Sequence, residues 1–241
     1  MESPLLSIVL PVYNEGENIR EALSRLEKEV RTACKVLVVY DFEEDTTLPV
    51  LEELLPSLPP HFPVEKVRNK YGRGVLYAIR TGMEAAATPY IVVTMADLCD
   101  PPHVIDLLVA KAEEEKADIV CASRYMKGGS QKGGPFLKGL MSRTAGLTLH
   151  YFAGLPTSDP TNSFKLYRKE FLENTPIEST GGFELGIELV VKAHASGKTV
   201  REVPTSWSDR EAGKSNFKLM KWLPKYLKWY FYAFTHPRKK R

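Results

Sequence analysis

Short apolar runs alternate with amphipathic segments through the first half of the chain, and this alternation limits the possible folds more than any other feature. The run 5–12 is apolar almost throughout, as in a strand buried on both faces, and Ile19, Leu23 and Leu26 then follow at helical spacing. Such alternation predicts right-handed βαβ units around a mostly parallel sheet. We expect strands at 5–12, 35–40, 64–67, 90–94 and 118–123, and helices at 18–32, 48–58, 75–87 and 104–115.

The pattern changes after residue 123. The segment 126–135 is rich in Gly and Lys, which is typical of a mobile loop, and Pro224 is expected to interrupt an aromatic helix at 217–234. No internal repeat or linker is visible, so we expect one α/β domain at 1–215 and an amphipathic extension at 216–241. The remaining expected elements are helices at 136–152 and 183–196, strands at 164–168 and 199–206, and a polar loop at 208–215.

Composition narrows the class of protein. Of the 241 residues 43% are hydrophobic, as in a soluble globular protein, and a net charge of +3 is too small to indicate a nucleic-acid partner. Cys34, Cys99 and Cys121 match no zinc spacing, and no N-terminal signal segment is recognisable, which favours a reducing, cytosolic location. No run approaches the about 18–20 apolar residues of a membrane-spanning helix, so we expect a protein that can touch a membrane but does not cross it.

Polar loops follow four of the predicted strands. The carboxyl ends of parallel strands meet at one edge of a sheet, where ligands bind, so these loops are expected to lie together. Carboxylates there suit a divalent cation or a ribose, Gly72 and Gly74 allow close approach to the backbone, and Arg73 suits a phosphate. The loops are 13–15, 41–47, 71–74 and 95–97.

Asp97 lies just past the strand expected at 90–94. Its carboxylate could hold a cation that binds a diphosphate. The alternative is that Asp97 begins a turn or caps the helix after Pro101 and Pro102. The segment alone favours the turn, but the three other polar loops favour the ligand site.

Several enzyme classes lack their signatures here. The sequence has no Walker loop, no G-x-G-x-x-G fingerprint and no legible Ser-His-Asp arrangement. The histidines occur at unrelated places and are expected to be structural or surface residues; they are His61, His103, His150, His194 and His236.

The blocks around the polar loops resemble those of family 2 glycosyltransferases, which have the GT-A fold. They occur in the family's order, and the last one resembles the subgroup of dolichol-phosphate mannose synthases and related polyprenyl-phosphate sugar synthases. The matching blocks are 7–15, 38–47, Arg73 and Gly74 with Ala78 and Gly82, 123–125, 158–168, and 202–204 with Asp209, Arg210, Gly213 and Ser215.

The resemblance implies roles at the matching positions. Asp97 would hold Mg²⁺ or Mn²⁺ on the diphosphate of a nucleotide sugar, and Arg124 and Arg210 would join it in catalysis. The nucleotide would be bound by Pro11, Tyr13, Glu15, Asp41, Arg73, Gly74 and Ala96. The phosphate of a lipid acceptor would be bound by Arg124, Lys138, Ser142, Arg143 and Arg210. A solvated helix face explains Lys138 and Arg143 equally well, and a surface ion pair with Asp209 is the alternative for Arg210.

The chain departs from the family pattern at the metal site. Met95 stands where the family has the first carboxylate of D-x-D, Cys99 stands where relatives often have an oxygen ligand, and Tyr40 replaces a usual Asp. Hard divalent cations prefer oxygen to sulfur, so these changes put metal binding in question. Glu43, Glu44 or Asp45 could compensate, although a solvated acidic loop is the favoured interpretation.

The reaction implied is inverting sugar transfer from a nucleotide sugar, of GDP-mannose or UDP-glucose type, to a polyprenyl or dolichyl phosphate. A phosphate acceptor is already ionised at neutral pH, so no general base is needed. The segment 217–234 interleaves Lys with aromatic residues and the basic cluster 237–241 follows, which suits attachment to the cytosolic face of a membrane. The alternative for this segment is an aromatic helix packed on the core.

Two other functions remain open from the sequence. A family 2 transferase with a soluble or protein hydroxyl acceptor would need a base, for which Asp159 and Glu184 are candidates. A non-catalytic sugar-nucleotide-binding subunit would explain Met95 and Tyr40.

Overall fold

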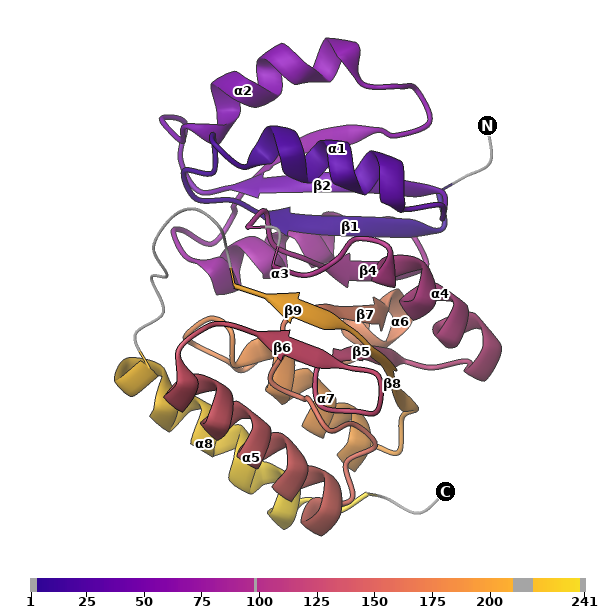
Figure 1. Ribbon diagram of the computed structural model, residues 1–241, viewed down its shortest axis with the longest axis vertical. Helices are drawn as coiled ribbons and strands as arrows, with labels where there is room; N and C mark the ends of the chain where they lie inside the picture. The colour runs from indigo at the N-terminus through magenta and orange to yellow at the C-terminus, as the bar shows by residue number, and fades with distance from the viewer. Residues whose placement is uncertain (1–3, 98, 210–218, 239–241) are drawn as a thin grey trace.

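A central sheet organises the protein in the computed structural model, which describes residues 4–97, 99–209 and 219–238. Within these residues the sheet has seven strands in the order β3-β2-β1-β4-β7-β5-β8 (Figure 1). Only β7 runs antiparallel to its neighbours in this sheet, which confirms the predicted mostly parallel α/β fold. The strands are β1 (Leu6–Pro11), β2 (Cys34–Tyr40), β3 (Val64–Arg68), β4 (Tyr90–Val93), β5 (Ile119–Ser123), β7 (Lys165–Arg168) and β8 (Val200–Pro204).

Helices cover both faces of the sheet, because successive side chains of a strand point to opposite faces. Ile8 and Leu10 of β1 join a core cluster with α1 (Ile19–Glu29), α2 (Thr47–Leu54) and α4 (Val104–Glu115). Val9 joins a second cluster on the other face. That cluster includes residues of α3 (Val75–Ala85), α5 (Phe136–Ala153), α7 (Leu185–Ala195) and α8 (Leu219–Thr235). Two short helices complete the described elements, η1 (Leu55–Ser57) and α6 (Lys169–Glu173).

Two sequence predictions for the second half are wrong. The expected mobile loop at 126–135 contains β6 (Ser130–Lys132), which pairs in parallel with β9 (Ser206–Ser208) beyond the end of β8. The pairing is non-local, so the Gly- and Lys-rich sequence does not reveal it. The expected interruption at Pro224 is also absent, since α8 continues through this residue. Proline removes one backbone hydrogen bond, and the packing of α8 on the core compensates for that loss.

The helix α8 is attached to the core through a few of its side chains. Trp229 is 1% exposed, and the ammonium group of Lys192 on α7 lies 5.0 Å from its ring centre. Tyr230 donates a hydrogen bond from its hydroxyl to Thr148 Oγ1 of α5 at 3.1 Å. The helices α5 and α8 therefore form one layer beside the sheet (Figure 1). None of the described helices has the length and hydropathy needed to span a bilayer.

We predict that Gly146→Ala lowers the free energy of unfolding by about 1–3 kcal/mol. A Cβ at Gly146 would overlap the backbone carbonyl of Ser158, which cannot move without displacing the loop at 157–162. Gly139→Ala on the same helix is the matched control, because its Cβ would meet only the flexible Gln131 amide at 3.1 Å. Chemical denaturation should show a loss for the first variant and a change within about 1 kcal/mol for the control. An equal loss of stability in both variants would mean that α5 does not need a glycine where it passes the Ser158 carbonyl.

Candidate active site

A large cavity opens at the carboxyl ends of β1, β2 and β4 and extends between α5 and α8. Its volume is about 1170 Å³. The loops after β1, β2, β3 and β4 all contribute to its wall, as expected at this edge of a parallel sheet. Among the predicted site residues its lining includes Pro11, Tyr13, Glu15, Asp41, Arg73, Gly74, Ala96, Asp97, Arg124, Lys138 and Ser142.

Asp41 joins the loops after β2 and β3. One of its carboxylate oxygens accepts the backbone N–H of Gly74 at 2.8 Å, and the other accepts the side-chain amide of Asn69 at 2.7 Å. Gly74 has φ 135°, a backbone conformation that residues with a Cβ rarely adopt. The carboxylate therefore fixes the shape of the glycine loop as well as lining the cavity.

An aromatic corner lies beside Asp41. The rings of Tyr13 and Phe42 meet edge to face with 5.5 Å between centres, and the Arg73 guanidinium lies 4.5 Å from the centre of the Phe42 ring. Tyr13 is 53% exposed, although an aromatic ring usually buries much of its surface. Tyr13 and Arg73 line the cavity, so this corner contributes an exposed ring and a cation to it. Phe42 was not a sequence candidate, because its role depends on its meeting with Tyr13.

The acidic loop after β2 was expected to be solvated, but the side chain of Asp45 in this loop is not. It is fully buried, and it accepts backbone N–H groups from Asn14 at 3.0 Å and Thr47 at 2.8 Å. Asn14 has φ 56° and accepts the N–H of Thr46, so the two loops hold each other. Asp45 therefore holds the loop at 13–15 in place and does not replace the carboxylate that is missing at Met95.

Asp97 begins a turn, as one interpretation of its segment expects, and it also lies at the cavity wall. It lines the cavity, and its Oδ1 accepts the N–H of Cys99 at 3.3 Å, as in an Asx turn. Met95 and Cys99 line the same cavity. In the described part of the chain no three His, Cys, Asp or Glu side chains are grouped to hold a metal.

Asp100, which was not a sequence candidate, is a further carboxylate in the lining. Its Oδ1 is buried and has no hydrogen-bond partner among the described residues. Burial raises the pKa of Asp100 to about 7, while Arg124 opposes this shift and the negative charge of Asp97 adds to it. The signal in the sequence was its position three residues after Asp97, ahead of two prolines.

Arg124 and Asp159 form a buried ion pair next to Ser142 of α5, which lines the cavity. Arg124 Nε donates to Asp159 Oδ2 at 2.6 Å, and its Nη2 donates to Asp159 Oδ1 at 2.9 Å and to Ser142 Oγ at 3.1 Å. Burial lowers the pKa of Arg124, but the Asp159 carboxylate outweighs it and holds the pKa above its ordinary value. The Nη1 nitrogen of Arg124 takes part in none of these three hydrogen bonds.

The other proposed acceptor ligands fall into three groups. Ser142 lines the cavity and is hydrogen-bonded to Thr161 at 2.6 Å, and Lys138 lines it from one turn earlier on α5. Arg143 is exposed and is not part of the lining, so the structure places it on the solvated face of the helix. Arg210 lies outside the described residues.

The two candidate bases, Asp159 and Glu184, are hydrogen-bonded to other groups and do not line the cavity. Asp159 is fully buried against Arg124. Glu184 is 1% exposed, and its two oxygens accept the N–H groups of Gly181 and Gly182, each at 2.6 Å. Both carboxylates therefore make structural contacts away from the cavity and are poorly placed to take a proton from an acceptor.

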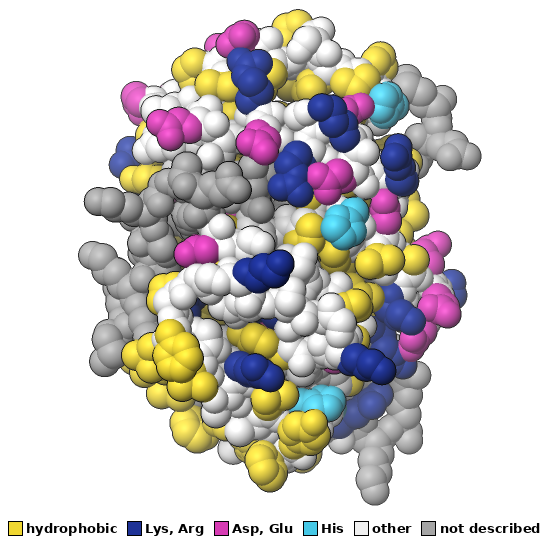
Figure 2. Space-filling view, viewed as in Figure 1, with side chains coloured by type: hydrophobic (Ala, Val, Ile, Leu, Met, Phe, Trp, Pro, Cys, Tyr) yellow, Lys and Arg dark blue, Asp and Glu magenta, His cyan; other side chains and the backbone are white. Residues whose placement is uncertain are grey.

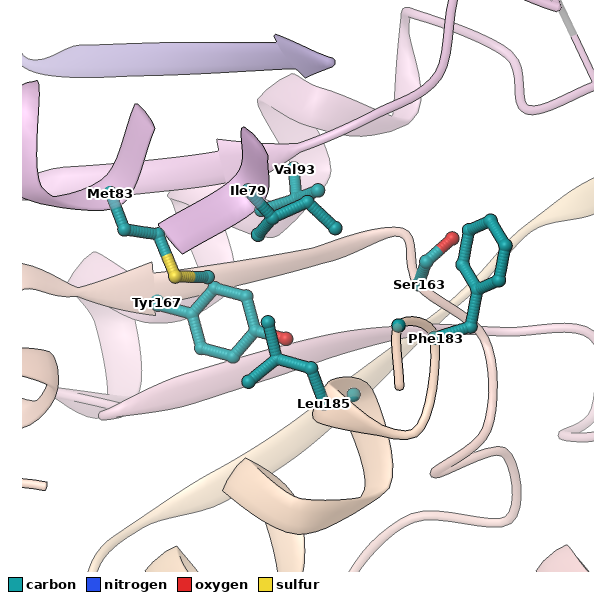
Figure 3. Close-up of a pocket in the computed structure, with 9 residues that line it drawn as sticks. Ile79, Met83, Val93, Ser163, Tyr167, Phe183 and Leu185 are labelled. Atoms are coloured by element: carbon teal, nitrogen blue, oxygen red, sulfur yellow. The ribbon is translucent and has the colours of Figure 1, made fainter. Parts of the chain in front are cut away.

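A second pocket is too small for a substrate. It lies between α3, β7 and the start of α7, where Met83, Tyr167 and Leu185 face one another (Figure 3). Its volume is about 10 Å³, and no charged side chain lines it among the described residues. We interpret it as a packing gap in the core.

We predict that Asp159→Asn lowers the free energy of unfolding by about 3–5 kcal/mol, because it leaves the buried guanidinium of Arg124 without its counter-charge. Glu53→Gln is the control, since Glu53 pairs with Arg20 at 3.0 Å on the surface and should change stability by less than about 1 kcal/mol. Urea denaturation of both variants measures the difference. A small loss for Asp159→Asn would show that water reaches Arg124.

The chain matches known proteins over most of its length. The model of Glycosyl transferase family 2 matches residues 7–175. A dolichol-phosphate mannosyltransferase of Pyrococcus furiosus is 32% identical over 218 residues, which cover 88% of this chain and 59% of the relative. A polyprenol monophosphomannose synthase of Mycolicibacterium smegmatis is 29% identical over 214 residues, covering 86% of this chain and 79% of that protein. The chain thus spans little more than half the length of the first of these relatives.

Solved structures confirm the fold. Glucosyl-3-phosphoglycerate synthase from Mycobacterium tuberculosis, in complex with Mn²⁺, UDP and glucosyl-3-phosphoglycerate, aligns with a TM-score of 0.65 at 14% identity, covering 97% of this chain and 80% of that one. S. aureus TarS 1–349 in complex with UDP-GlcNAc aligns with a TM-score of 0.62 at 16% identity, covering 96% and 73%. With the family match over residues 7–175, these findings show that the chain belongs to glycosyl transferase family 2 and has the GT-A fold.

Proposed function

We propose that this protein transfers a sugar, with inversion, from a nucleotide sugar to a polyprenyl phosphate at a membrane surface. One observation carries the proposal: the cavity joins the polar loops of the sheet edge to the space between α5 and α8. A nucleotide sugar fits the first part, and a phosphate on an apolar chain fits the second. The names of the relatives from Pyrococcus furiosus and Mycolicibacterium smegmatis support the same pair of substrates.

The donor side of the cavity suits a nucleoside diphosphate. The exposed ring of Tyr13 offers an aromatic surface to the base, Arg73 can pair with phosphate, and Gly74 allows close approach to the backbone. Asp97 lines the wall where the diphosphate would lie, and its oxygen is a ligand type that Mg²⁺ and Mn²⁺ accept. A divalent cation held there would stabilise the charge that develops on the departing diphosphate.

The acceptor side suits a phosphate monoester. An acceptor phosphate oxygen would bond to the anomeric carbon while the bond from that carbon to the diphosphate breaks, and the bonding pair leaves with the diphosphate. No proton moves in this step, so no base is required. Lys138, Ser142 and Arg124 line this side and can hold the phosphate. The commitment of Asp159 and Glu184 to other partners argues against a hydroxyl acceptor.

Apolar side chains on α5 and α8 support contact with a membrane. Hydrophobic side chains gather over the lower part of the molecule in Figure 2, where Figure 1 places these two helices. The lysines Lys225 and Lys228 lie on the same helix as several of them and suit anionic lipid. We therefore propose peripheral attachment to the cytosolic face of a membrane. The exposed apolar residues are Phe136, Leu137, Leu140, Tyr151, Phe152, Leu227, Phe231 and Phe234.

We predict that Lys138→Ala raises KM for polyprenyl phosphate at least tenfold, because it removes a cation from the acceptor side of the cavity. Arg143→Ala is a matched control: it removes a cation from the exposed face of the same helix and should change KM less than twofold. The measurement is transfer of labelled sugar from GDP-mannose or UDP-glucose to polyprenyl phosphate in vesicles, followed by extraction into organic solvent. Donor binding without transfer to any lipid would contradict the proposal and favour a non-catalytic nucleotide-binding subunit.

We predict that the double variant Phe152→Ser, Phe231→Ser binds vesicles containing anionic lipid at least tenfold more weakly. Each buried phenylalanine side chain contributes about 1.5–3 kcal/mol, so the loss of two should be large. Co-sedimentation with vesicles measures this binding. Leu107→Ser is the control, since Leu107 is 47% exposed but lies on α4. An equal loss in the control would mean that binding does not depend on α5 and α8.

A further inference from the structure

The part of the cavity between α5 and α8 is polar at one end and mostly apolar elsewhere. At the polar end α5 contributes Lys138 and Ser142, and Ser142 is hydrogen-bonded to Arg124 at 3.1 Å. Such a wall suits an amphiphile whose phosphate lies beside the cations and whose apolar chain follows the helices. The apolar lining includes Met141 and Ala145 of α5, Leu223 and Leu227 of α8, and Ile187 of α7.

A pair of hydroxyl groups marks the other end of this stretch. The Tyr230 hydroxyl of α8 donates a hydrogen bond to Thr148 Oγ1 of α5 at 3.1 Å, and both residues line the cavity. Thr148 Oγ1 itself donates to the carbonyl of Thr144 at 2.8 Å, so its oxygen is placed to accept from Tyr230. Among the described residues of the lining, none of α5 follows Thr148 and none of α8 follows Tyr230. The hydrogen bond therefore joins the two helices where the cavity ends.

An apolar surface begins directly beyond this pair. The next turns of both helices expose aromatic side chains, and these belong to the surface for which we propose membrane contact. The Tyr230 ring already contacts the Phe234 ring, with 5.3 Å between centres. The pair thus lies between the cavity and the apolar surface. The exposed side chains are Tyr151 (73%) and Phe152 (78%) of α5, and Phe231 (58%) and Phe234 (41%) of α8.

The stretch of cavity along α5 is too short for the whole chain of a polyprenyl phosphate. An α-helix rises about 1.5 Å per residue, so the wall from Lys138 to Thr148 is ~15 Å long. A longer chain, with its phosphate beside Lys138, has to leave the cavity. Exposing the chain to water is unfavourable, whereas a path between Thr148 and Tyr230 leads onto apolar surface. Their hydrogen bond has to break for this path to open.

We propose that Tyr230 discriminates between lipid acceptors by chain length, because its hydrogen bond to Thr148 closes the cavity behind a short chain and opens for a long one. This inference rests on the proposed function, since it takes the ligand to be a phosphate on an apolar chain. A short chain ends inside the cavity and leaves the bond intact. A long chain passes between α5 and α8 and reaches the apolar surface. One hydrogen bond contributes modestly, so the discrimination is a change of a few fold in affinity.

The test is binding of a long and a short lipid phosphate, undecaprenyl phosphate and citronellyl phosphate, to the full chain in nonionic detergent. Binding is followed by quenching of tryptophan fluorescence, to which Trp222 in the cavity lining contributes. We expect Tyr230→Phe to lower the Kd for undecaprenyl phosphate by about threefold or more, because no hydrogen bond then has to break. The Kd for citronellyl phosphate should not change.

A second variant and a control complete the design. Thr148→Val removes the other hydroxyl of the pair while keeping the shape of the side chain, and it should have the same effect. The double variant should gain no more than either single variant, because all three lose the same hydrogen bond. Tyr232→Phe is the matched control: it removes a hydroxyl from the same helix outside the cavity lining and should change neither Kd.

The outcomes separate this inference from the proposed function. An unchanged Kd for undecaprenyl phosphate in both Tyr230→Phe and Thr148→Val would overturn the role of the pair and leave sugar transfer to lipid intact. An equal fall in Kd for both lipids would also overturn it, since the pair would then not sense chain length. Absence of undecaprenyl phosphate binding to the original chain would overturn it as well. The expected pattern of binding, with no sugar transferred to either lipid, would overturn the proposed reaction and support the role of Tyr230.

Discussion

The buried ion pair of Arg124 and Asp159 holds together the segments of the protein that meet beside α5 at the wall of the cavity. Arg124 follows β5, and Asp159 lies in the loop that leads into β7. The same guanidinium reaches Ser142 on α5, so one side chain links three segments that are distant in sequence. A buried charge pair of this kind is costly to break, because either partner alone would be left without compensation.

Two further carboxylates, the half-buried Asp41 and the fully buried Asp45, join loops at the edge of the sheet. Asp41 ties the end of β2 to the glycine loop, and Asp45 ties the loop after β1 to the start of α2. Asp45 accepts backbone N–H groups, and Asp41 accepts one backbone N–H and the side-chain amide of Asn69. In the loop after β4 the carboxylates that line the cavity are Asp97 and Asp100.

Much of this arrangement could be predicted from the order of the residues. The continuous apolar runs gave strands close to β1, β2, β4 and β5, and the parallel-sheet rule brought Tyr13, Asp41, Gly74 and Asp97 to one edge. The predictions were wrong where a partner is remote. Pairing of β6 with β9 and the burial of Asp45 depend on contacts between segments that local composition does not report.

The sequence by itself determined the parallel sheet, the edge of the sheet at which the cavity opens, and the residue types available there, because these follow from hydrophobic period and strand direction. Tertiary structure alone decided which polar groups are used up by the fold and which face the cavity. Arg143 and Lys138 lie on one helix, yet only Lys138 lines the cavity, and Asp100 became visible only through its buried, unpaired oxygen. The physical reason is that burial and hydrogen-bond satisfaction are properties of the packed whole, since each depends on neighbours that come from elsewhere in the chain.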